Sequence, residues 1–134
     1  TESGILATAN GRAPVPLDPE NDARPGLFLT RQGDASEYLA NQTPAPRWIK
    51  LRLAGQPGNP DAIGARVQLV FSRGLRVHDE IGLGGGWLSQ SAPAIFVGRP
   101  TGQRLVEAQV TWPGGRISQH QDPPDHGLWT IRQP

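Results

Sequence analysis

The residue types that carry most enzyme chemistry are sparse in this chain. It has three histidines, at positions 78, 120 and 126, and no cysteine, so thiolate nucleophiles, thiolate-bound metals and disulfides are excluded. His78 stands directly before Asp79 and Glu80, and an imidazole beside carboxylates can exchange protons near neutral pH. These three residues fall on a predicted strand, so we interpret them as part of an exposed strand edge.

A second group of ionisable residues lies near the end of the sequence. His120 and His126 enclose Asp122 and Asp125, residue types that bind zinc. A zinc site needs three or four ligands that converge on one point. Two prolines divide this group, and the segment has the composition of a solvated turn. The pattern favours a turn over a metal site.

Nucleophilic and acid–base catalysis find no supporting pattern. Ser89 and Ser91 lack an identifiable base, and no Gly-x-Ser-x-Gly turn occurs. Asp79 or Glu80 could pair with Glu107, as glycoside hydrolysis requires, but any β-domain offers such pairs. We predict no catalytic residues and a protein that is not an enzyme.

A glycine-rich stretch, residues 82–86, contains four glycines and leads into Trp87. Glycine reaches backbone conformations that other residues adopt only at a cost. A phosphate-binding loop would continue into a helix and carry spaced glycines or a Lys-Ser/Thr pair, and this stretch does neither. We predict a bulge or a corner of a β-structure, with Trp87, Ser89 and Gln90 as candidate binding residues beside it.

The four tryptophans make up half of the aromatic residues: Trp48, Trp87, Trp112 and Trp129. On an exposed sheet, an indole ring can stack on a sugar or anchor a protein interface. All four lie in or next to predicted strands, where burial at the core is the alternative. Trp87 and Trp129 are the candidates for a carbohydrate-binding platform.

The overall composition limits the partners. With 13 basic and 12 acidic residues the net charge is +1, and no basic stripe predicts a nucleic-acid partner. No apolar run approaches the roughly 20 residues of a transmembrane segment. The sequence does not start with methionine, which predicts a processed chain or a fragment.

The apolar pattern predicts an all-β protein. Ile49, Leu51 and Leu53 alternate with Lys50 and Arg52, the period of a strand with one buried face. Similar patterns predict strands over residues 63–72, 75–81, 95–97, 104–112, 116–120 and 128–132. The 17 glycines and 14 prolines suit short strands joined by turns. We predict about eight short antiparallel strands in a sandwich or a partly open barrel.

Two features refine this prediction. Residues 73–74 predict a tight hairpin in which Val77 and Ile81 face the core. Residues 1–45 differ from the rest, because their prolines cannot donate the backbone bonds of an interior strand. We predict an extended Pro-rich arm over residues 1–24 that lies on a partner, then a hairpin around residues 32–34. Residues 46–134 are predicted to form one β-domain.

Five elements in order resemble the ASPIC/UnbV domain. They are residues 48–55, the Ile-Gly-Ala-Arg-Val run at 63–67, the glycine turn leading to Leu-Ser-Gln-Ser at 88–91, Phe-Val-Gly at 96–98, and Ala-Gln-Val-Thr-Trp-Pro-Gly-Gly at 108–115. The resemblance covers residues 47–133. It implies an extracytoplasmic location, periplasmic or secreted, and a role in binding or assembly, and it brings no catalytic residues.

This domain typically follows FG-GAP/VCBS repeats in larger extracellular proteins, and residues 18–27 resemble the calcium loop of such a repeat. Asp18, Glu20 and Asp22 occupy the first ligand positions, whereas Ala23 and Gly26 replace the loop glycine and the later aspartate. Calcium needs six to eight oxygens around a sharp turn. The three acidic residues are therefore weak metal candidates, and we expect no cofactor.

The sequence thus predicts a non-catalytic extracytoplasmic interaction or assembly module. It would be an accessory subunit of a larger surface or membrane-associated complex, with other protein subunits as partners. The alternative is a carbohydrate-binding module that uses exposed tryptophans.

Overall fold

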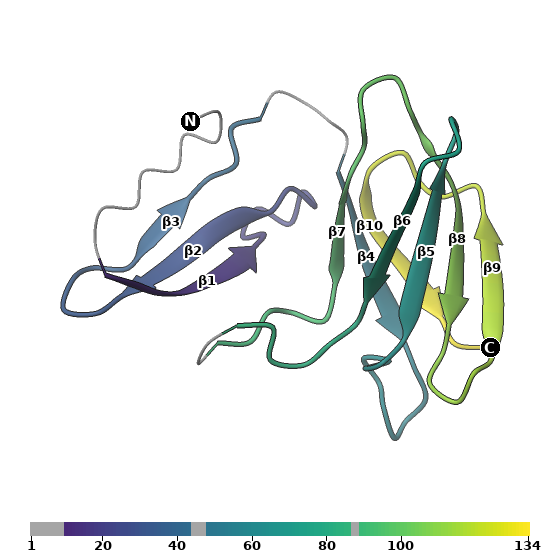
Figure 1. The fold of residues 1–134 in the computed structure, drawn as a ribbon, viewed down its shortest axis with the longest axis horizontal. Coiled ribbons are helices and arrows are strands. Elements are labelled where there is room, and N and C mark those ends of the chain that lie inside the picture. Colours follow the sequence, from purple (N-terminus) through teal and green to yellow (C-terminus); the bar gives the residue numbers. More distant parts are fainter. Residues whose placement is uncertain (1–9, 44–47, 87–88) are drawn as a thin grey trace.

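The protein is built from three β-sheets. A computed structural model describes residues 10–43, 48–86 and 89–134 (Figure 1). These ranges contain ten strands and no helix: β1 (Gly11–Leu17), β2 (Gly26–Arg31), β3 (Glu37–Leu39), β4 (Trp48–Ala54), β5 (Arg66–Phe71), β6 (Arg76–Glu80), β7 (Ile95–Gly98), β8 (Leu105–Thr111), β9 (Ile117–Gln121) and β10 (Gly127–Arg132). The all-β prediction is confirmed, and the described sheets are open and do not close into a barrel.

Two of the sheets form a sandwich (Figure 1). One has the strand order β10-β4-β7, and the other has the order β6-β5-β8-β9. Neighbouring strands are antiparallel except for β10, which runs parallel to β4 and places Ile131 beside Leu53. Strands from the middle and the end of the sequence are therefore neighbours in one sheet.

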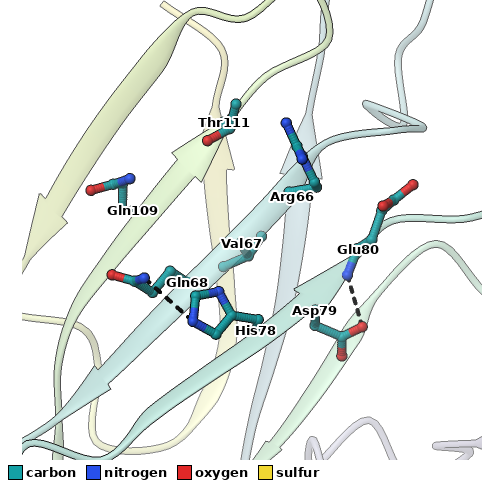
Figure 2. A pocket seen from close by; sticks show the side chains of 8 residues that line it. All are labelled: Arg66, Val67, Gln68, His78, Asp79, Glu80, Gln109 and Thr111. Carbon is teal, nitrogen blue, oxygen red and sulfur yellow. Dashed lines mark hydrogen bonds between the residues drawn. The ribbon is translucent and has the colours of Figure 1, made fainter.

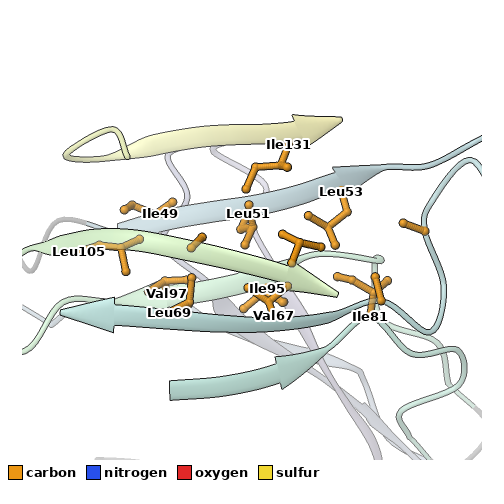
Figure 3. Close-up of a cluster of buried hydrophobic side chains, with 14 of the residues drawn as sticks. Ile49, Leu51, Leu53, Val67, Leu69, Ile81, Ile95, Val97, Leu105 and Ile131 are labelled. Carbon is orange, nitrogen blue, oxygen red and sulfur yellow. The ribbon is translucent and has the colours of Figure 1, made fainter. Parts of the chain in front are cut away.

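The core lies between these two sheets (Figure 3). The predicted alternation in β4 is confirmed, since Ile49 and Leu51 are fully buried while Arg52 is exposed. Trp112 and Phe71 are the largest fully buried side chains. Burying one large apolar side chain stabilises a fold by roughly 1.5–3 kcal/mol. Every member of this core cluster lies between residues 49 and 131.

Strand β6 is exposed on both faces. Val77 lies on the core-facing side, as predicted, because it pairs with the buried Leu69, but the predicted burial of Val77 is wrong. Val77 is 39% exposed, whereas Ile81, directly after the strand, is 2% exposed. β6 is the edge of the four-stranded sheet, and the sheet that faces it has only three strands. The inward side of β6 therefore meets solvent, and only its end reaches the core.

Strands β1, β2 and β3 form a separate antiparallel sheet beside the sandwich (Figure 1). The predicted hairpin is confirmed as β2–β3, where Leu27 pairs with Leu39. The predicted arm is wrong for residues 11–17, because they form β1 and pair with β2; residues 1–9 lie outside the described residues. Pro14 and Pro16 fit into β1 because an edge strand can lack N–H donors on its open side.

A buried ion pair joins this N-terminal sheet to the sandwich. The Asp18 side chain, just after β1, is 0% exposed, and its carboxylate accepts hydrogen bonds from the backbone N–H groups of Asp22 and Ala23 at 3.1 and 3.2 Å. Lys50 of β4 places its Nζ 3.0 Å from the same carboxylate and 5.5 Å from the ring centre of Phe96. The charge of Asp18 is thus compensated where the N-terminal sheet meets the sandwich.

The glycine-rich stretch connects the two layers of the sandwich. It follows β6 at the edge of one sheet and leads toward β7 at the edge of the other. Gly84 has φ of +66°, a conformation that side chains disfavour. Gly86 forms an isolated bridge with Ser89, and a Cβ at Gly86 would lie 3.9 Å from the carbonyl oxygen of Pro14. The predicted corner is present, and it also approaches β1.

Candidate functional site

The residues predicted from the sequence to bind a partner or ligand do not form one site. Trp87 lies outside the described residues. Ser89 is half-buried and Gln90 is exposed, both just before β7, whereas Trp129 lies in β10. Since β7 and β10 are the two outer strands of the three-stranded sheet, these candidates belong to opposite flanks of the sandwich.

Trp129 is held in place by its neighbours. Its side chain packs against the core cluster, and its ring meets His120 of β9 edge to face, with centroids 6.5 Å apart and planes at 85°. A sugar-binding platform needs an open ring face. This half-buried position weighs against Trp129 as a carbohydrate platform.

A hydrogen-bonded chain of side chains lies next to Trp129. The indole N–H of the buried Trp112 donates to Ser118 Oγ at 2.8 Å. Ser118 Oγ also lies 2.9 Å from His120 Nε2, and the tautomer of the imidazole sets which of the two groups donates. Ser118 Oγ thus supplies the acceptor for a buried indole N–H.

Sequence reasoning missed this chain of contacts. Ser118 and His120 stand two positions apart, which places both on one side of a strand. That spacing was visible in the sequence, but the packing of β9 against β10 was not. The two strands together form what we call the β9–β10 flank, residues 117–121 and 127–132.

The β9–β10 flank exposes large apolar side chains. Ile117 is 58% exposed and Leu128 is 51% exposed. Each strand is also the outer strand of its sheet, and neither contains a proline. β9 has no Asp, Glu, Lys or Arg, and β10 has only Arg132. Edges without prolines and with few charges are open to pairing with another strand.

The other strand edges in the described ranges carry protective features. β1 contains two prolines, β3 has three residues, and β7 has four residues and is soon followed by Pro100. β6 carries three charged residues, Arg76, Asp79 and Glu80. Short strands, prolines and charges all discourage further pairing. The β9–β10 flank therefore stands apart from the remaining edges.

A second surface is a polar depression on the outer side of the four-stranded sheet (Figure 2). It has a volume of about 520 Å³ and is lined by Arg66, Val67, Gln68, His78, Asp79, Glu80, Gln109 and Thr111. Strand pairing aligns His78, Gln68, Gln109 and Gln119 in one row across the sheet. Their contacts are long, 3.4 Å for Gln68 to His78 and 3.4 Å for Gln119 to Gln109. Such loosely held amides can exchange their partners for ligand hydroxyl groups.

The carboxylates weighed for catalysis are separated. Glu107 pairs with Val70 in the ladder, whereas Glu80 pairs with Arg66, near the other end of β5. Glu107 also accepts a hydrogen bond from Gln121 at 2.7 Å. The geometry therefore does not place two carboxylates across a shared substrate position.

Two of the three acidic side chains in the loop after β1, Asp18 and Asp22, already use their oxygens. Asp18 accepts two backbone N–H groups and pairs with Lys50. Asp22 accepts the backbone N–H of Arg24 at 2.9 Å and pairs with its guanidinium at 3.2 Å. Within the described ranges, no three His, Asp or Glu side chains are grouped to hold a metal ion. A lysine thus occupies the place beside Asp18 where a cation would bind.

The fold and these surfaces define a small β-sandwich domain whose polar groups lie on sheet faces and edges. Residues 55–134, more than half of the chain, match the family model of ASPIC and UnbV. The chain therefore belongs to the ASPIC/UnbV family, a family of extracellular-type domains. The match begins after β4, so a preceding FG-GAP/VCBS-like segment stays a prediction.

No curated protein was found that matches the chain. The part of the chain that the structure describes also contains no helix with the length and apolar character needed to cross a membrane.

Proposed function

We propose that this domain is a non-catalytic interaction module that binds another protein subunit through the β9–β10 flank. The observation that supports this is the pair of unprotected strand edges on one side of the sandwich. Ile117 and Leu128 are each more than half exposed there. A strand added to either edge would satisfy the free backbone groups of that edge and lie beside its exposed apolar side chain, and backbone pairing is a common mode of peptide recognition.

Photocrosslinking tests this proposal. A photoreactive phenylalanine analogue replaces Ile117 or Leu128 in the full chain, and a control replaces Val77, a half-exposed residue on the opposite edge. We expect a discrete adduct with one protein, identified by mass spectrometry, from positions 117 and 128 only. Equal adducts from position 77, or none from the flank, would refute the use of this surface.

A second candidate function is carbohydrate binding at the polar depression. It is favoured by the row of amide and imidazole groups, with Arg66 and Glu80 at one end. This version of the function uses hydrogen bonds and does not use Trp129. We expect a glycan array to show binding that Gln68→Ala and Gln109→Ala abolish and Trp129→Phe preserves; the opposite pattern would restore the tryptophan platform.

We further propose that the domain works outside the cytoplasm, as an accessory subunit of a larger assembly. Membership of a family of extracellular-type domains supports this. In cells of the native organism whose outer envelope is permeabilised while the cytoplasmic membrane stays intact, added protease or a membrane-impermeant biotin reagent should reach the chain. Labelling only after cell lysis would contradict the location.

A further inference from the structure

Among the strands that the structure describes, β10 is the outer strand of its sheet, and its outward backbone groups have no strand partner. Gln133, directly after β10, donates its N–H to the carbonyl of Ala54 at 2.8 Å. Backbone groups alternate in direction along a strand. Odd-numbered residues of β10 therefore turn toward β4, and the even-numbered Leu128, Thr130 and Arg132 turn toward the open edge. The pairing with β4 has no register shift that would bend this edge.

In the sandwich sheet β10-β4-β7, every charged residue of the strands is positive. Its strands carry Lys50, Arg52 and Arg132 and contain no Asp or Glu. Lys50 is neutralised by Asp18. Arg52 and Arg132 are exposed on the outer side, and neither joins an ion pair in the described part of the chain. Arg132 lies on the edge strand itself, and Arg52 lies one strand further in, beside Thr130.

The inner side of the same edge is apolar. Trp129 packs against the core and Ile131 is 3% exposed, and both point inward. The side chains of an added strand would alternate in the same way as those of β10. Its inner residues would lie next to Trp129 and Ile131, and its outer residues would lie next to Arg132, with Arg52 one strand further away.

We infer that β10 binds an extended segment of a partner protein in which acidic residues alternate with apolar residues. This inference rests on the proposed function and specifies the partner. Backbone bonds to Leu128, Thr130 and Arg132 give the affinity, while the arginines and the apolar inner side select the side chains. A second copy of β10 fits less well, because it would bring another Arg132 instead of a carboxylate.

The test is a titration of the full chain with two designed peptides. In one, valine alternates with glutamate, and in the other lysine replaces each glutamate. We expect the NMR amide signals of Leu128, Thr130 and Arg132 to shift with the glutamate peptide. It should bind roughly tenfold more tightly than the lysine peptide, and raising the salt concentration should reduce this difference.

Three variants locate the binding. Thr130→Pro removes one outward N–H and leaves the bonds to β4, so it should abolish binding. Arg132→Glu should favour the lysine peptide. Arg76→Glu, the same charge change on β6, should leave both affinities unchanged. Urea unfolding checks that each variant is folded. If Thr130→Pro does not fold, Arg132→Glu alone tests whether the peptide binds at β10.

The outcomes separate the inference from the proposed function. Equal binding of both peptides, lost in Thr130→Pro, would overturn the acidic specificity and keep the flank as a strand-binding surface. No binding of either peptide, or binding that Thr130→Pro and Arg132→Glu leave unchanged, would overturn the inference as a whole. The crosslinks from positions 117 and 128 would then decide the proposed function independently.

Discussion

At the scale of single residues, the hydroxyl of Ser118 accepts the hydrogen bond of a buried indole. Trp112 is 1% exposed, and its N–H donates to Ser118 Oγ, which in turn contacts His120. A buried donor that loses its acceptor costs roughly 1–3 kcal/mol. The contact therefore contributes to stability beyond its small area.

Ser118→Ala should lower the free energy of unfolding by roughly 1–3 kcal/mol, because the Trp112 N–H would remain buried without an acceptor. Urea unfolding followed by tryptophan fluorescence measures the change. Ser118→Thr is the matched control, since it keeps a hydroxyl and suits a strand. Equal stabilities of the two variants would show that the hydrogen bond is unimportant.

The glycines between residues 82 and 86 are not equivalent. Gly84 has φ of +66°, whereas Gly85 lies outside the positive-φ region and has open space where a side chain would begin. Gly84→Ala should cost roughly 1–2 kcal/mol, because a Cβ is disfavoured in the left-handed region. Gly85→Ala should be close to neutral in the same urea experiment. A larger loss from Gly85→Ala would contradict the described loop conformation.

At the scale of elements, the Asp18–Lys50 pair links β4 to the loop that follows β1. The Asp18 side chain is fully covered, and Lys50 is its only cationic partner in the described residues. Without the Lys50 cation, the buried Asp18 carboxylate would keep only its two backbone N–H donors. The N-terminal sheet should then open more readily than the sandwich.

Lys50→Met should raise the hydrogen-exchange rates of β1 and β2 amides by roughly tenfold or more, since 1.4 kcal/mol changes an equilibrium tenfold. Mass spectrometry of exchanged peptides measures this. Amides of β5, inside the four-stranded sheet, should keep their rates. Lys50→Arg, which retains the charge, serves as the control. Unchanged exchange in Lys50→Met would mean that other contacts hold the N-terminal sheet.

Much of the strand pattern could be predicted from the sequence. The alternation of Ile49, Leu51 and Leu53 identifies β4 because side-chain direction depends only on local geometry. The exposure of Val77 could not be predicted, because it depends on the widths of two sheets that face each other. The same holds for the β9–β10 flank, where Ser118, His120 and Trp129 meet only after separate sheets have packed.

At the scale of the whole molecule, the core is confined to the sandwich. Its members span residues 49–131, and the buried Ala13 and Ala23 of the N-terminal part do not belong to it. The sandwich therefore contains the apolar contacts needed for its own stability. The ion pair between Asp18 and Lys50 joins the N-terminal sheet to it.

A chain that begins at Trp48 should still unfold in one cooperative transition, because it keeps the whole core cluster. Circular dichroism during thermal unfolding measures this. A chain that ends at His126 is the comparison; it loses Ile131 and Trp129 from the core and should not unfold cooperatively. If only the chain that ends at His126 unfolded cooperatively, the sandwich would not be the part of the molecule that is stable on its own.

The parallel pairing of β10 with β4 also sets an order for biosynthesis. As the nascent chain leaves the ribosome, β4 emerges with the first half of the sandwich, but its second neighbour is the last strand of this sequence. Until residues 127–132 are released, one side of β4 has no partner within the sandwich. Such long-range pairing is slow, and exposed strand edges invite wrong partners. A pause in translation just before β10 would therefore be the moment at which this domain most needs a chaperone.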